Sequence, residues 1–146
     1  MKTRKSWIPA LILGLSVLAL NPAALRAQQQ SVEPQQPVSN DKVIGTWDVE
    51  VIAEGQSYFL TMVLSQNQGQ LEGTVSEQNG MFTDAVLSSL TFDGENLAFE
   101  FTGPTPPDGL PRLIQTALKV TGDTMEGSVT VPDLGVYAQA KAAKKS

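Results

Sequence analysis

The sequence predicts an all-β fold, an eight-stranded antiparallel up-and-down β-barrel. From Val43 onward, apolar and polar side chains alternate with a period of two, which is typical of strands with one solvent-facing side. Turn residues recur at short intervals, and Asn79-Gly80 is the strongest hairpin dipeptide because both residues tolerate positive φ. Because strands adjacent in sequence tend to pair and open edges favour aggregation, we expect the first and eighth strands to close the sheet.

The first 27 residues are not expected to belong to the barrel. A positively charged start that includes Lys2 and Arg4 precedes the apolar run Ile8–Leu20, and Ala27 supplies a small residue for cleavage. The run is about 13 residues long, shorter than the roughly 20 that a membrane-spanning helix needs. Residues 1–27 are therefore predicted to be a secretory signal peptide of a soluble protein exported to the periplasm or the extracellular space.

The rest of the chain divides into three parts. Residues 28–40 are rich in Gln, Pro and Ser without apolar periodicity, which predicts a disordered linker. Residues 41–143 form the predicted barrel, and residues 144–146 a short tail. Six basic and fifteen acidic residues remain after position 27, so the net charge is 6 − 15 = −9 and a nucleic acid or an anionic membrane is not an expected partner.

The first four strands are expected to be separated by three turns. The first three cover residues 46–51, 58–64 and 70–76, and their apolar positions are Trp47, Val49 and Val51, then Tyr58, Leu60, Met62 and Leu64, then Leu71, Gly73 and Val75. The turns between them lie at 54–57 and 67–69, where glycine accompanies polar residues. The fourth strand, within residues 81–92, is less regular, and Ser88-Ser89 indicates a bulge or a break.

Four further strands follow with the same alternation. They cover residues 97–102, 114–120, 125–131 and 134–141, and their apolar positions include Leu97, Phe99, Phe101, Ile114, Leu118, Val120, Met125, Val129 and Val131. Turns are expected at Asp93-Gly94, Gly122-Asp123 and Pro132-Asp133, and Pro104–Pro111 makes one long, proline-rich connection. The inward face of the last strand stays open: Val136, Ala138 and Ala140 suit a core, whereas Lys141 beneath Trp47 would turn Tyr137 and Gln139 inward.

Counting the strands as alternately up and down assigns each turn to an end of the barrel. The links near Gly55, Gly80, Pro132 and within Pro104–Pro111 fall at one end, which we expect to be the mouth. Trp47 and Lys141 fall together at the opposite, closed end.

Three segments carry a resemblance to a known family. Gly45-Thr46-Trp47, the stretch Gly69–Val75 and the stretch Gly122–Gly127 resemble the lipocalin-related calycin barrels, including the avidin-like ones, and small exported bacterial lipocalin-like domains most of all. The resemblance implies that Gly45 and Trp47 close the barrel beneath a basic residue from a late strand, for which Lys141 is the best match. Biotin binding is not implied, because it needs several cavity tryptophans, and haem binding would need an axial histidine.

The composition excludes several chemistries. The chain has no His and no Cys, which rules out Ser-His-Asp and Cys-His catalysis and ordinary zinc sites. Asp48 and Glu50 have the spacing of a carboxylate pair, but they alternate with apolar residues and are expected to face water. Asp93–Asn96 is too short for a calcium loop and is expected to be a hairpin turn. No catalytic residue, metal or cofactor is predicted.

Two functional hypotheses remain. In the first, a non-enzymatic lipocalin-like barrel binds a small apolar ligand, or part of one, near its mouth through Tyr58, Leu60, Phe99, Phe101 and Ile114. In the second, a barrel with a filled core has a structural role or contacts an exported protein partner through the Pro104–Pro111 loop or an edge. An enclosed apolar space above about 300 Å³ would favour the first. The oligomeric state is not predicted.

Overall fold

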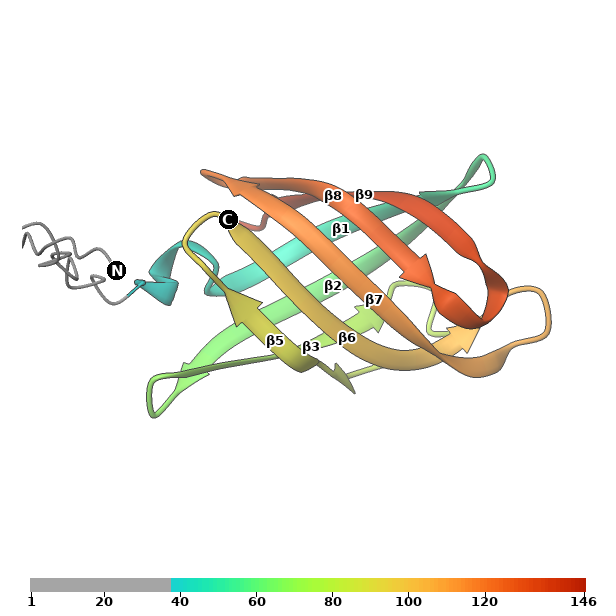
Figure 1. Ribbon diagram of the computed structural model, residues 1–146, viewed down its shortest axis with the longest axis horizontal. Coiled ribbons are helices and arrows are strands. Elements are labelled where there is room, and N and C mark those ends of the chain that lie inside the picture. The colour runs from blue at the N-terminus through green and yellow to red at the C-terminus, as the bar shows by residue number, and fades with distance from the viewer. Residues whose placement is uncertain (1–37) are drawn as a thin grey trace, which may run out of the picture. The chain divides into compact units, whose positions relative to one another are not determined.

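The computed structural model describes residues 38–146, which form one antiparallel sheet rolled into a nearly closed barrel (Figure 1). The nine strands are β1 (Gly45–Ala53), β2 (Gln56–Asn67), β3 (Gln70–Glu77), β4 (Ala85–Val86), β5 (Ser88–Phe92), β6 (Asn96–Thr105), β7 (Leu110–Thr121), β8 (Thr124–Val131) and β9 (Val136–Lys144). Their order around the barrel is β4-β3-β2-β1-β9-β8-β7-β6-β5. There are two short 3-10 helices among the described residues. Asn40–Lys42 precedes β1, and Pro132–Leu134 lies between β8 and β9.

The all-β antiparallel class is confirmed, but the count of eight strands is wrong. The expected fourth strand is split into β4, which pairs only with β3, and β5, which pairs only with β6. The register between β5 and β6 shifts between Ser88 and Thr91, and Ser89 adopts a positive φ of 50°, so the irregularity expected at Ser88-Ser89 is present. This kink moves the chain from the β3 side of the barrel to the β6 side, which leaves a seam between β4 and β5.

The first and last strands pair antiparallel, as expected. The register runs from Trp47 opposite Lys144 to Ile52 opposite Gln139. Figure 1 shows the β1–β2, β6–β7 and β8–β9 connections at one end of the barrel and the β2–β3, β5–β6 and β7–β8 connections at the other. The turns therefore sort to the two ends as strand parity predicts.

Inward side chains form one continuous core. On β9 the buried residues are Ala138, Ala140 and Ala142, whereas Tyr137 is 69% exposed. The open question about the last strand is thus settled in favour of its small residues. Six large side chains are almost completely buried: Trp47, Met62, Leu64, Leu97, Met125 and Val43.

Trp47 closes one end of the barrel. Its side chain is fully buried, and its Nε1 donates a hydrogen bond of 2.8 Å to the carbonyl oxygen of Val43. Val43, which is also fully buried, follows the 3-10 helix Asn40–Lys42. Gly45 has a φ of 132°, and a Cβ there would approach Lys144 Cε to 3.0 Å, so a side chain would disturb this end.

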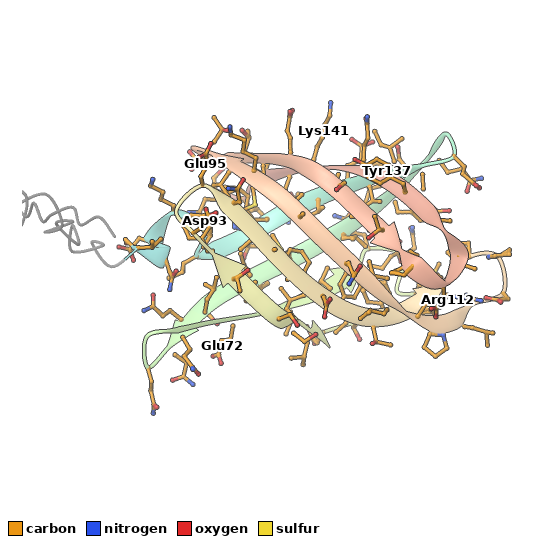
Figure 2. The ribbon with its side chains drawn as sticks, in the orientation of Figure 1. Glu72, Asp93, Glu95, Arg112, Tyr137 and Lys141 are labelled. Atoms are coloured by element: carbon orange, nitrogen blue, oxygen red, sulfur yellow. The ribbon has the colours of Figure 1, made fainter. Side chains whose placement is uncertain are left out.

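The basic residue beside Trp47 is Lys144 and not the expected Lys141. Lys144 Nζ lies 5.4 Å from the centroid of the indole ring, within the range of a cation–π contact. Because side chains alternate along β9, Lys141 shares the outer face with Tyr137, and Figure 2 shows both pointing away from the barrel. The strand also continues three residues further than expected, which brings Lys144 to the closed end.

The carboxyl-terminal residues are bound to the barrel. The backbone N–H of Lys144 donates to Asp123 O at 2.9 Å, and that of Lys145 donates to Thr46 O at 2.8 Å. The expected tail of residues 144–146 therefore begins inside the last strand. Residues 1–37, which include the expected signal peptide and most of the expected linker, lie outside the described residues. No helix within residues 38–146 has the length and apolar character to cross a membrane.

We expect Trp47→Ala to lower the free energy of unfolding by about 3 to 5 kcal/mol, because it removes a fully buried aromatic ring and its hydrogen bond. Denaturant titration followed by circular dichroism measures the change. Tyr137→Ala, on the outer face, is the matched control and should stay within about 0.5 kcal/mol of the parent. A loss below about 1 kcal/mol for Trp47→Ala would contradict its role in closing the barrel.

Candidate functional site

A cavity of about 160 Å³ lies inside the barrel at the mouth end. Its walls come from seven strands and from the turns at that end, including Glu54, Pro106 and Leu134. All five residues that the sequence predicted for a ligand site line it: Tyr58, Leu60, Phe99, Phe101 and Ile114. The barrel-closing residues Gly45 and Trp47 and the outward Lys141 do not.

Strand pairing brings the five residues to two walls. Tyr58 lies opposite Val51 and Leu60 opposite Val49 in the β1–β2 ladder. On the other wall, Phe101 lies opposite Ile114 in the β6–β7 ladder. Because inward positions recur at every second residue, these pairs face one interior.

The cavity exists because inward side chains near the mouth are short on one side of the barrel. The parts of β1, β8 and β9 that line it contribute only valine and alanine: Val49, Val51, Ala53, Val129, Val131, Val136 and Ala138. At the closed end, by contrast, Trp47, Leu97 and Met125 fill the interior. A barrel of about eight strands is just wide enough to be filled by its own side chains, so short ones leave space.

Three aromatic rings form the opposite side of the cavity. The Phe82 and Phe101 ring centroids are 5.8 Å apart and those of Phe99 and Phe101 6.4 Å apart, both in tilted arrangements. Phe82 lies in the β3–β4 connection next to the seam and was not predicted from the sequence as a site residue. Its position two residues after the Asn79-Gly80 turn is the feature of the sequence that could have indicated it.

Buried polar side chains are concentrated at this cavity. Among the described residues, the buried polar or charged side chains are Glu77, Thr105 and Thr116, and all three line the cavity. Glu77 is only 5% exposed. Its Oε1 accepts a hydrogen bond of 2.8 Å from Asn79 Nδ2, and its Oε2 accepts one of 3.1 Å from the backbone N–H of Met81.

Glu77 was not predicted from the sequence as a site residue. It lies in the same phase as Leu71 and Val75, so the period of two that predicts the inward face of β3 also points Glu77 inward. A charged residue at an inward position is a stronger signal of a site than an apolar one, because burial of a charge is costly without partners.

The proline-rich connection is mostly a hairpin. β6 extends to Thr105 and β7 begins at Leu110, so Pro104 lies opposite Pro111, and the two residues without a backbone N–H pair with each other. Both Arg112 Nη atoms bind the carboxylate of Asp108, at 2.7 and 2.6 Å, and Nη1 also donates to Thr105 Oγ1 at 2.9 Å. These contacts of Arg112 hold the tip of the hairpin beside the part of the cavity wall that Thr105 forms.

The carboxylates considered for other chemistry lie away from the cavity. Glu50 accepts a hydrogen bond from the Ser57 hydroxyl at 2.7 Å, and Asp48 lies 3.5 Å from Lys145 Nζ. Asp93 accepts hydrogen bonds from the side chain and backbone of Asn96 and from the backbone N–H of Glu95, which lower its pKa to about 2. Within residues 38–146, no group of three or more potential metal ligands gathers.

Asp108 provides a pH prediction. Hydrogen bonds from Arg112 and from the backbone N–H of Leu110 hold the pKa of Asp108 well below its usual range. The contribution of this pair to hairpin order is therefore complete above about pH 3.8 and is lost as the pH falls through the lowered pKa. We expect Arg112→Gln to raise the pKa of Asp108 toward 3.8 and to leave that of Asp93, at the other end of the barrel (Figure 2), unchanged. Carboxyl-carbon NMR titration measures both pKa values. An unchanged pKa of Asp108 in Arg112→Gln would contradict the interaction between Arg112 and Asp108.

No protein-family model matches the chain, and no curated protein and no solved structure matches it significantly.

Proposed function

We propose that this protein is an exported, non-enzymatic, lipocalin-like binding protein whose barrel holds the apolar part of a small ligand in the mouth cavity. The observation that carries the proposal is the cavity itself, with apolar walls and the five expected residues on them. Export is proposed from the signal-like residues 1–27. The absence of His and Cys from the chain supports a binding role over catalysis by the common nucleophiles.

The volume limits what can enter. Pockets that enclose a whole drug-sized ligand usually begin near about 300 Å³, whereas an apolar cavity of about 150 Å³ is enough for benzene. A cavity of about 160 Å³ therefore suits one aromatic ring or a short branched alkyl group. The remainder of a larger ligand would lie at the rim, where Met81 and Leu134 line the cavity and are 48% and 37% exposed.

The same observations support a second candidate, a barrel that contacts a partner protein. A volume below about 300 Å³ is what the filled-core hypothesis expects. Three exposed apolar side chains at the mouth, Met81, Leu110 and Leu134, would then form part of the contact surface. Such side chains on one end of a protein are typical of interaction sites when they are contiguous.

We expect toluene and indole to raise the melting temperature of purified residues 28–146, because a ligand that binds only the folded state stabilises it. Ala138→Leu fills part of the cavity and should weaken toluene binding at least tenfold. Ala143→Leu, the same substitution on the outer face of β9, is the matched control and should bind toluene as the parent does. Thermal shift and ligand-observed NMR measure these effects.

Two results would contradict the ligand-binding proposal. One is that neither toluene nor indole stabilises the parent protein at any soluble concentration. The other is that Ala138→Leu and Ala143→Leu bind toluene equally well. Either result favours the partner-contact barrel.

A further inference from the structure

We infer that the mouth cavity selects ligands whose apolar part carries a cationic amine, and that the buried carboxylate of Glu77 holds the ammonium group. The inference rests on the proposed function, because it concerns the chemistry of the same cavity. The ligand would then carry a positive charge, which binding in an apolar cavity does not by itself require.

Glu77 is one of the residues that line the mouth cavity. It is the last residue of β3 and lies opposite Leu60 of β2, which is itself a cavity residue. Only 5% of Glu77 is exposed, and the strand alternation points it to the interior. A ligand ring between the walls would therefore have this carboxylate at its side.

Among the described residues, the carboxylate of Glu77 has an incomplete set of hydrogen-bond donors. Each of its oxygens accepts one hydrogen bond, from Asn79 Nδ2 and from the Met81 N–H, whereas a carboxylate can accept about four. Within residues 38–146, the ion pairs join Arg112 to Asp108, Lys119 to Glu95 and Lys145 to Asp48, and none includes Glu77. Buried carboxylates usually have a cationic partner, and a ligand ammonium would supply one here.

The charged side chains that line the cavity are acidic. Among residues 38–146, the only other charged residue that lines the cavity is Glu54, at the β1–β2 turn, and it is also acidic. Beyond position 27, acidic residues outnumber basic ones by fifteen to six. This field attracts cations to the mouth and repels carboxylate ligands such as fatty acids.

Glu77 also shapes the turn that follows it. Its backbone N–H donates to Phe82 O at 3.0 Å, and its carbonyl oxygen accepts from the Gly80 N–H at 3.0 Å. A purely structural role would make Glu77 matter for stability and leave the choice among ligands unaffected. The experiment therefore compares ligands of equal size and different charge.

The test measures binding of benzylamine, benzyl alcohol and toluene to the purified protein by calorimetry or NMR titration at pH 7. We expect benzylamine to bind at least tenfold more tightly than benzyl alcohol. Glu77→Gln should reduce benzylamine affinity at least tenfold and change toluene affinity less than about twofold. Glu72→Gln removes an exposed carboxylate from the same strand and should change none of the three affinities (Figure 2).

A second measurement needs no variant and so does not depend on the folding of Glu77→Gln. In the parent protein, benzylamine affinity should fall toward that of benzyl alcohol as the pH rises above the pKa of the amine, while toluene affinity stays level. Loss of the positive charge from the ligand then removes the interaction that we assign to Glu77.

The outcomes separate the two proposals. If toluene binds in the cavity but benzylamine has no advantage over benzyl alcohol, the inference about Glu77 is wrong and the proposed function stands. The same holds if the advantage persists in Glu77→Gln. If none of the three compounds binds, both proposals fail.

Discussion

The barrel depends on a single interior that is shared by inward side chains from strands far apart in the sequence. Trp47 on β1 meets Val43 before it and Lys144 at the end of the chain, and its indole N–H is satisfied there by a backbone carbonyl. Large inward residues gather at this end, whereas near the mouth β1, β8 and β9 contribute only short ones to the same interior. The sizes of the inward side chains therefore explain both the dense packing at the closed end and the cavity at the mouth.

The two ends also differ in how buried polar groups are satisfied. At the closed end, the Trp47 N–H donates to the carbonyl oxygen of Val43. At the mouth, the Glu77 carboxylate has two donors and no cationic partner among the described residues. Buried polar groups with unused hydrogen-bonding capacity lower stability and can bind a ligand, which is why we propose the mouth as the binding end.

The chain between β3 and the seam also contributes to that end. β3 ends at Glu77, and the connection that follows carries Phe82 onto Phe101. Near the split, the Leu87 N–H donates to Gly73 O at 2.9 Å, and the Leu87 side chain is buried. The mouth therefore combines an aromatic wall from β6 and the β3–β4 connection with a carboxylate at the end of β3.

By itself, the sequence determined the antiparallel all-β class, the pairing of the first and last strands, the end at which each turn lies and the five apolar residues of the cavity. These features follow from a period of two and from turn chemistry, which are local properties of the chain. Only the tertiary structure decided that the fourth strand splits, that Lys144 replaces Lys141 beside Trp47, and that Glu77 borders a space of about 160 Å³. Those features depend on register and on how side chains from remote strands fill a common volume, which no local pattern encodes.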